Sequence, residues 1–146
     1  MNAGELCIRR VYTADATESI VAVAQRMARN NVGDLVVVEQ TGDGVRPIGI
    51  VTDRDLVTRG IALGTPLALE LTVRDVMHES LVTAFDDEAV DIVLRRIKQH
   101  GIRRIPIVDR AGLLQGILTL DDIVAWIGEQ LSNAARLLED QAAAVS

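Results

Sequence analysis

The sequence predicts a mixed α/β (α+β) fold made of two similar halves and continued by a long C-terminal helix. The segment from Gly49 to Leu56, GIVTDRDL, returns 67 residues later from Gly116 to Ile123 as GILTLDDI. The upstream segments also match in order, at an offset of 70. Helical and strand patterns alternate within each copy. Units of about 60 residues are marginal alone, so we expect the two to pack into one body.

The first half has the pattern of a short strand, a helix, two strands and a second helix. Residues 17 to 31 place apolar side chains on one helical face, after a short strand near Thr13. Runs of β-branched residues at 35 to 39 and 48 to 51 flank a glycine-bearing turn, which is typical of neighbouring strands. Thr52, with Asp55 three residues later, has the pattern of a capping box and predicts a helix that ends between 60 and 64.

The second half follows the same order. Pro106 indicates a strand edge or a bulge, and Gly101 should end the helix before it. The predicted elements are a helical turn at 73 to 77, a strand near Thr83, a helix from 86 or 87 to 100, strands at 103 to 108 and 113 to 118, and a helix opening at Thr119.

The final helix is predicted to be long, because a helical stripe of apolar residues continues past the second repeat. The stripe comprises Ile123, Trp126, Ile127, Leu131, Ala134, Leu137 and Leu138. The expected division of the chain is therefore repeat one at 7 to 64, a linker at 65 to 72, repeat two at 73 to 129, and a helical extension and tail at 130 to 146.

Composition and charge exclude several classes of function. The net charge is −6, the predicted pI is near 4.8 and no basic block occurs, which argues against a nucleic-acid surface. No apolar stretch approaches the length of a membrane span, and charged residues occupy the N-terminus, so we expect a cytoplasmic protein that does not enter membranes. His78, His100 and the single Cys7 lack metal-site spacing; we interpret the histidines as surface or helix-end residues and Cys7 as buried and apolar.

The paired Gly-h-h-Thr-x-x-Asp segments, with IPIVD at 105 to 109 before the second, resemble a tandem pair of cystathionine-β-synthase (CBS) domains. The resemblance covers about residues 7 to 129, and the chain is similar to small stand-alone bacterial CBS-pair proteins. It implies two pseudo-symmetric β-α-β-β-α repeats packed through their sheets, with clefts between them. In many members these clefts bind AMP, ADP, ATP, NAD or S-adenosylmethionine as a regulatory ligand. No catalytic residue and no required cofactor is implied.

The residue types in the repeated motif suit such a ligand. A carboxylate such as Asp55 or Asp122 can accept hydrogen bonds from both ribose hydroxyls. Thr52 and Thr119 are predicted at helix N-termini, which favour ribose or phosphate oxygens. The other expected ligand-binding residues are Leu35, Val36, Ile105 and Pro106 around the adenine, Arg54, Arg103 and Arg104 for phosphates, and Thr13 and Thr83 on the leading strands.

The two halves also differ, so we expect unequal clefts. Gly33 and Asp34 occupy the positions that match Arg103 and Arg104, which predicts that phosphates favour one cleft. Asp53 and Asp121 add negative charge that opposes polyphosphates. Repeat one opens with the segment from Leu6 to Val11 in place of the Val-x-Asp-Val-Met run of repeat two, so one cleft entrance is expected to differ.

Three functions remain open. The leading one is a non-enzymatic energy or cofactor sensor that binds an adenosine-containing ligand and signals through the geometry of a homodimer, formed with help from the final helix, to an unidentified protein partner. In the second, both Thr-Asp pairs only cap helices, and the chain is a homodimeric structural or interaction module with empty clefts. The remote third is a haloacid-dehalogenase-like phosphatase in which Asp53 attacks phosphorus and Asp55 handles the proton, although Leu120 matches Asp53 in repeat two.

Overall fold

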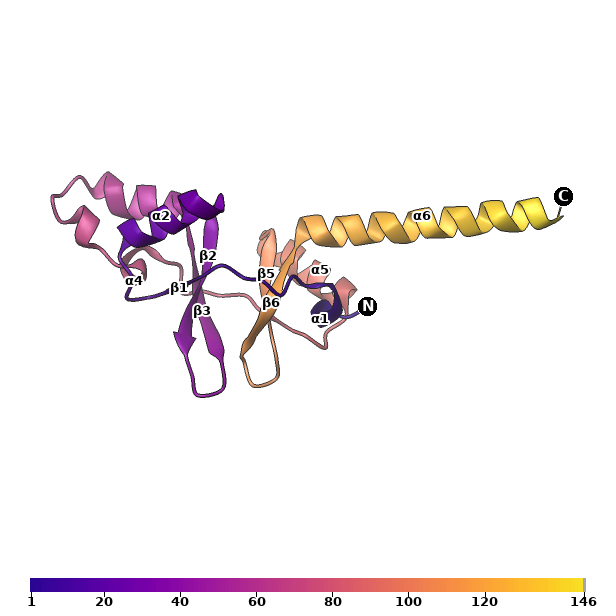
Figure 1. Ribbon diagram of the computed structural model, residues 1–146, viewed down its shortest axis with the longest axis horizontal. Coiled ribbons are helices and arrows are strands. Elements are labelled where there is room, and N and C mark those ends of the chain that lie inside the picture. Colours follow the sequence, from indigo (N-terminus) through magenta and orange to yellow (C-terminus); the bar gives the residue numbers. More distant parts are fainter. Residues whose placement is uncertain (146) are drawn as a thin grey trace.

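The computed structural model describes residues 1–145 and shows two halves side by side, each with a three-stranded sheet (Figure 1). Both sheets pair their first two strands parallel and their last two antiparallel. The strands are β1 (Thr13–Asp15), β2 (Asp34–Gln40) and β3 (Val45–Thr52) in the first half, and β4 (Ala84–Phe85), β5 (Arg104–Val108) and β6 (Leu114–Thr119) in the second. The predicted α/β class and the two repeats are confirmed.

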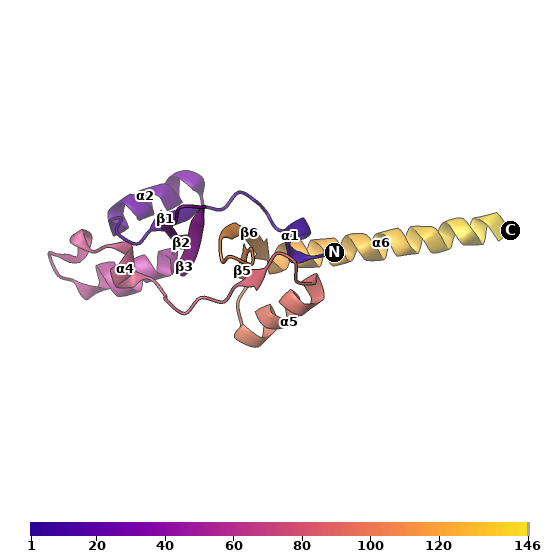
Figure 2. The same ribbon diagram turned by 90° about the horizontal axis from the view of Figure 1, so that it is seen from below.

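Helices cover the outer faces of both sheets, and Figure 2 shows α2 and α5 on opposite sides of the molecule. The helices are α1 (Ala3–Leu6), α2 (Ile20–Asn30), α3 (Asp53–Asp55), α4 (Val73–Val76), α5 (Val90–His100) and α6 (Leu120–Val145). The helix predicted from Thr52 begins as α3, continues as a π-helical turn at Leu56–Gly60 and ends with a 3-10 turn at Ile61–Leu63, within the predicted range of 60 to 64. A separate 3-10 turn follows at Ala68–Glu70. Gly101 ends α5 with a φ of 62°, as predicted.

Repeat one has a counterpart of the helical turn at 73 to 77, although it lacks the Val-x-Asp-Val-Met sequence. Helix α1 precedes α4 by 70 residues, the offset of the repeat. The two turns make equivalent contacts, because the Ala3 N–H donates to Glu88 O at 2.8 Å and the Val73 N–H donates to Glu18 O at 2.9 Å. The match is hard to see in the sequence because only residue size and polarity are similar, as in Cys7 against Met77.

Each of these equivalent turns packs on the half that follows or precedes its own in the sequence: α1, at the start of the first repeat, packs on the second half, and α4, at the start of the second repeat, packs on the first. Ile8 and Ile117 exchange two backbone hydrogen bonds of 2.9 Å, and Ile50 and His78 exchange two of 3.0 and 3.2 Å. The chain therefore crosses between the halves twice, once after Ile8 and once after His78. Each half is completed by a segment that precedes the other half in the sequence.

The glycines that open the repeated motif lie where these crossing segments contact the sheets. A Cβ atom on Gly49 would lie 2.5 Å from the His78 carbonyl oxygen and 2.9 Å from Met77 Cε. A Cβ atom on Gly116 would lie 2.6 Å from Cys7 Sγ and 2.7 Å from the Ile8 carbonyl oxygen. Neither glycine has a positive φ, so backbone conformation does not require glycine at these positions. Glycine is needed because another segment of backbone approaches each of them too closely for a side chain.

Each half has its own aliphatic core beneath its helices. Fully buried members are Val23, Leu35, Val37, Val51, Val73 and Val76 in the first core and Val93, Ile97, Ile105, Ile107, Leu118 and Ile123 in the second. Cys7 is buried in the second core as predicted, and burial raises the pKa of its thiol while Arg9 opposes that shift. Trp126 packs against the same core. Beyond Trp126, α6 is exposed up to its end at Val145, seven residues past Leu138, the last residue of the predicted apolar stripe.

Pro106 lies in the central strand of its sheet, so the predicted strand edge is wrong, while a register irregularity between Ile107 and Val108 confirms a neighbouring bulge. In the first half, the Val36 N–H donates to the Tyr12 carbonyl oxygen at 3.1 Å. Pro106, its counterpart, has no N–H. Accordingly β4 is shorter than β1, beginning at Ala84.

We predict that Gly49→Ala lowers the free energy of unfolding by about 1–3 kcal/mol, because the added methyl group must displace backbone or side chains from the crossing segment. Gly42→Ala is the matched control, since a Cβ atom there meets nothing within 4 Å. Urea denaturation measures both variants. Equal stabilities for Gly49→Ala and Gly42→Ala would contradict the close approach.

Candidate functional site

The two Thr-x-x-Asp motifs meet at the interface between the halves. Thr52 pairs with Asp34 in the first sheet, and Thr119 pairs with Arg104 in the second. Arg104 Nη1 lies 2.8 Å from Asp34 Oδ2, which joins the two sheets. Asp34 and Arg104 are equivalent positions of the two repeats, so the ion pair lies close to the pseudo-two-fold axis. The structure thus places Thr52, Asp34, Arg104 and Thr119 in one row, which we call the interface row.

At one end of the interface row, Thr52 and Asp55 form the predicted capping box. The Asp55 N–H donates to Thr52 Oγ1 at 3.1 Å, and the Thr52 N–H donates to Asp55 Oδ2 at 2.9 Å. Asp55 is 4% exposed, and its Oδ1 lies 2.8 Å from His78 Nε2. Both carboxylate oxygens of Asp55 therefore already have partners within the chain.

Sequence reasoning missed the role of His78, which it interpreted as a surface or helix-end residue. The ring is about half exposed, yet the crossing segment after α4 brings it to Asp55, and Arg59 Nε lies 3.9 Å from the same oxygen. Recognising that α1 and α4 are equivalent would have placed His78 beside the motif of the first half.

At the other end, the second motif has fewer partners. Thr119 Oγ1 donates to Asp122 Oδ2 at 2.7 Å and accepts from the Asp122 N–H at 3.1 Å. The residue equivalent to His78 is Ile8, whose side chain cannot hydrogen-bond. Asp122 is also less buried than Asp55. Asp122 therefore has fewer hydrogen-bond partners within the chain than its equivalent, Asp55.

A narrow cleft lies between the halves beside the ion pair. Its volume of about 70 Å³ is well below the roughly 300 Å³ or more that is usual for ligand pockets, so a nucleoside requires it to widen. Burial raises the pKa of the Asp34 carboxyl, and the charge of Arg104 opposes this shift. The lining residues are Arg10, Val11, Tyr12, Val32, Asp34, Val36, Arg104 and Ile117.

Two of the four predicted adenine-lining residues face elsewhere. Leu35 and Ile105 are 1% and 0% exposed in the helix-covered cores, so they are core residues and not slot residues. Successive side chains of a strand point to opposite faces, so only one of each adjacent pair can face the cleft. Val36 lines the cleft, and Pro106 is its equivalent in the second half.

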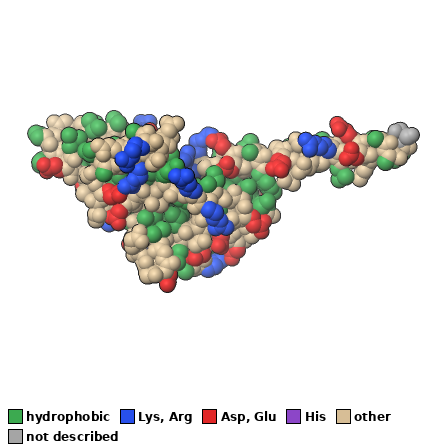
Figure 3. Space-filling view, viewed as in Figure 1, with side chains coloured by type: hydrophobic (Ala, Val, Ile, Leu, Met, Phe, Trp, Pro, Cys, Tyr) green, Lys and Arg blue, Asp and Glu red, His purple; other side chains and the backbone are tan. Residues whose placement is uncertain are grey.

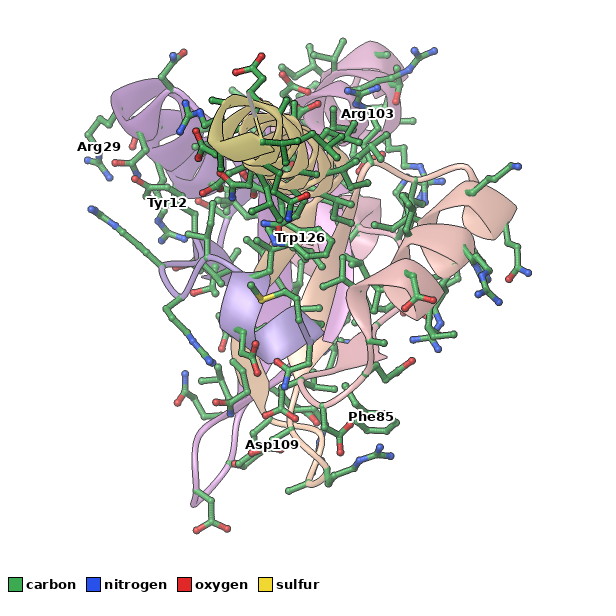
Figure 4. The ribbon with its side chains drawn as sticks, turned by 90° about the vertical axis from the view of Figure 1, so that its right-hand side faces the viewer. Tyr12, Arg29, Phe85, Arg103, Asp109 and Trp126 are labelled. Carbon is green, nitrogen blue, oxygen red and sulfur yellow. The ribbon has the colours of Figure 1, made fainter. Side chains whose placement is uncertain are left out.

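The predicted arginines are in different surroundings. Arg104 lines the cleft, whereas Arg103 lies 3.0 Å from Asp121, with both side chains largely exposed, a pairing that contributes little stability. Arg54 is exposed at the start of α3. Figure 4 shows Arg103 near the top of the molecule, beside the helices.

Thr13 and Thr83 anchor helices through their backbone carbonyl groups. Arg26 Nη1 donates to the Thr13 carbonyl oxygen at 2.8 Å, and Arg96 Nη1 donates to that of Thr83 at 3.1 Å. Each arginine also pairs with a glutamate, Glu18 or Glu88. The hydrogen bond from Arg96 holds the pKa of the Glu88 carboxyl below its ordinary value. Neither threonine lines the cleft described above.

The carboxylates of the phosphatase alternative are poorly suited to it. Asp53 is exposed and accepts a hydrogen bond from the Arg54 N–H at 2.8 Å, while Asp55 is buried with both oxygens occupied. No cluster of three or more metal-ligating side chains occurs within residues 1–145. None of the helices in that same range is long and apolar enough to span a bilayer.

The fold and the paired motifs agree with a known family. The family model of the CBS domain matches residues 3–61 and 73–129. The chain therefore belongs to the CBS domain family and carries two copies of the domain. The first match begins at α1, which the structure places on the second half.

Individual relatives support this assignment. The chain is 39% identical over 133 residues to YlbB of Bacillus subtilis, a match that covers 88% of this chain and 85% of YlbB. It is 36% identical over 124 residues to MK0525 of Methanopyrus kandleri, covering 85% of this chain but 61% of that protein. Among solved structures, the CBS domain pair of protein MJ0100, in complex with 5′-methylthioadenosine and S-adenosyl-L-methionine, has a TM-score of 0.71 at 26% identity and covers 89% of this chain and 98% of that one.

We predict that Asp55→Ala lowers the free energy of unfolding more than Asp122→Ala does. Removing the buried Asp55 carboxylate leaves the Thr52 N–H and the half-exposed His78 ring without their partner, a loss of about 1–3 kcal/mol. Asp122→Ala removes a partly exposed cap interaction, which costs about 1 kcal/mol or less. Urea denaturation at neutral pH measures the difference, and a larger loss in Asp122→Ala would contradict the described asymmetry.

Proposed function

We propose that this chain is a non-enzymatic regulatory module that binds an adenosine-containing ligand between its two halves. The observation that carries the proposal is the interface row: Asp34 and Arg104 line the cleft as an ion pair, and the two helix-capping threonines lie beside them in the sheets, outside the cleft lining. The comparison with MJ0100 supports the ligand class, because that CBS pair was solved with two adenosine compounds. AMP, ADP, ATP, NAD and S-adenosylmethionine all fit this class.

The cleft offers a surface for each part of such a ligand. Val36 and Ile117 provide apolar walls for an adenine, and Tyr12 adds an aromatic one. Asp122 and Thr119, at the start of α6, lie outside the lining of the narrow cleft; once the cleft widens, they provide acceptors and a donor for ribose hydroxyls. A phosphate or other anionic group is attracted to Arg104, which must then leave Asp34.

This competition for Arg104 provides a means of signalling. The ion pair with Asp34 joins the two halves, so breaking it alters the contact between the sheets. A ligand that binds the opened arrangement more tightly shifts the population toward it. We further propose that the chain acts in the cytoplasm as a homodimer and passes this change to a protein partner.

A second candidate is an interaction module whose clefts stay empty. The narrowness of the cleft and the occupied oxygens of Asp55 favour it. In that case the Thr-x-x-Asp pairs serve only to begin their helices. The two candidates differ in whether an adenosine compound stabilises the fold.

Thermal melting of nucleotide-stripped protein tests the proposal, with AMP, ADP, ATP, NAD and S-adenosylmethionine each at millimolar concentration. A ligand at 100 times its dissociation constant adds about 2.7 kcal/mol of stability, so we expect a selective rise in Tm for at least one compound. Guanosine monophosphate is the matched control for the adenine. The absence of a rise with all five compounds would favour the interaction module.

A further inference from the structure

The two segments that cross between the halves carry different residues at one pair of equivalent positions. Ile8 exchanges two backbone hydrogen bonds with Ile117, and His78 exchanges two with Ile50. Ile50 and Ile117 are equivalent, because they lie 67 residues apart, the offset of the repeated motif. Ile8 and His78 therefore lie at corresponding places beside the two Thr-x-x-Asp motifs, and both are about half exposed.

His78 covers the carboxylate that the first motif would offer to a ligand. Its Nε2 lies 2.8 Å from Asp55 Oδ1, and since a carboxylate only accepts hydrogen bonds, the ring nitrogen is the donor. The Thr52 N–H donates to Oδ2 at 2.9 Å, and Asp55 is 4% exposed. A ribose that donates two hydroxyl groups to this carboxylate must first displace the His78 ring.

The backbone of His78 is held in place, so only its side chain can move aside. Its carbonyl oxygen lies 2.5 Å from the position of a Cβ atom on Gly49, and its N–H donates to the Ile50 carbonyl oxygen at 3.0 Å. Rotating the ring away leaves the buried carboxylate without this donor, since Arg59 Nε, at 3.9 Å, is beyond hydrogen-bond distance. The lost hydrogen bond corresponds to a roughly 10- to 100-fold weaker affinity for a ligand at this site.

The second motif has no such cover. Ile8, at the place of His78, has no side-chain atom that can donate a hydrogen bond. Asp122 is more exposed than Asp55, and Thr119 Oγ1 donates to its Oδ2 at 2.7 Å. Its Oδ1 has no hydrogen-bond partner among residues 1–145. A ribose in the widened cleft can therefore reach Oδ1 of Asp122 without displacing a donor.

Charge does not distinguish the two sites. The first motif has Asp53 beside Arg54 in the sequence, and the second has Asp121 at 3.0 Å from Arg103. Each motif thus adds one neighbouring acidic residue and one neighbouring arginine. Figure 3 shows Lys and Arg side chains interspersed with Asp and Glu on the face in view, with no continuous basic surface there. The hydrogen bond from His78 is the difference that remains.

We propose that His78 closes the site at Asp55, so that each chain binds one adenosine-containing ligand, at Asp122. The inference rests on the proposed function and specifies which of the two equivalent carboxylates receives the ribose. His78 is a positioning residue in this role: it acts through Asp55 and contacts no ligand. The residue at this one place on each crossing segment determines whether the site beside it is open.

Calorimetric titration with AMP tests the proposal through its stoichiometry, which loss of stability alone does not raise. We expect the wild-type chain to bind one AMP and His78→Ile, which copies the residue of the second half, to bind two. The second AMP should bind roughly 10- to 100-fold more tightly to His78→Ile than to the wild-type chain. His100→Ile is the matched control, because it removes the other histidine, at the end of α5, and should leave one AMP bound.

The reciprocal variant moves the proposed lock to the second site. We expect Ile8→His to place an imidazole beside Asp122 and to weaken AMP binding by roughly 10- to 100-fold. Ile8→Val, which keeps an aliphatic side chain, is its control and should bind AMP as the wild-type chain does. Urea denaturation identifies the folded variants, and either exchange can be judged if the other fails to fold.

The outcomes separate this inference from the function on which it rests. Two AMP molecules bound to the wild-type chain would overturn the inference alone, as would equal stoichiometry in the wild-type chain and His78→Ile. An unchanged affinity in folded Ile8→His would also overturn it. If neither protein bound AMP and none of the five adenosine compounds raised Tm, the proposed function would be overturned together with the inference.

Discussion

The exchange of short segments between the halves determines the rest of the structure. The turn of α1 and the strand-like Ile8 complete the second half, while α4 and His78 complete the first. Backbone hydrogen bonds fix both segments, and Gly49 and Gly116 allow them to approach the sheets. Because the chain must cross between the halves to make these contacts, neither half folds from a contiguous segment, and their relative position is constrained.

That constraint creates the cleft. The first crossing carries Arg10, Val11 and Tyr12 along one wall, and the second delivers His78 to Asp55. The sheets meet with Asp34 and Arg104 close to the pseudo-two-fold axis, where equivalent residues of the two halves must confront each other. Because the two repeats carry opposite charges at these equivalent positions, the residues that meet at the axis form an ion pair. The two equivalent sites therefore differ: both carboxylate oxygens of Asp55 have hydrogen-bond partners, whereas Asp122 is more exposed and has fewer partners.

The sequence predicted the parts of this structure that depend on local periodicity. The alternation of strands, the helical stripes and the Thr-x-x-Asp caps each follow from spacing within a short window, and so the order of elements and both motifs were found. The exchange of α1 and α4 was missed because Ala3 and Cys7 match Val73 and Met77 only in character. The assignment of Leu35 to the cleft ignored strand alternation, which already separated it from Val36. The ion pair of Arg104 with Asp34 depends on how the halves dock, which spacing along one chain does not specify.

We propose that the ion pair between Arg104 and Asp34 holds the two halves together until an anionic group of a ligand binds Arg104. Calorimetric titration of AMP and adenosine into the wild-type chain, Arg104→Gln and Arg103→Gln tests it most directly, because Arg103 is an adjacent arginine outside the cleft. We expect Arg104→Gln to lose about 1.5–3 kcal/mol of AMP binding, the scale of hydrogen bonds to charged groups, with a smaller loss for adenosine and little change in Arg103→Gln. Equal losses in the two variants, or an unchanged affinity in Arg104→Gln, would contradict the account.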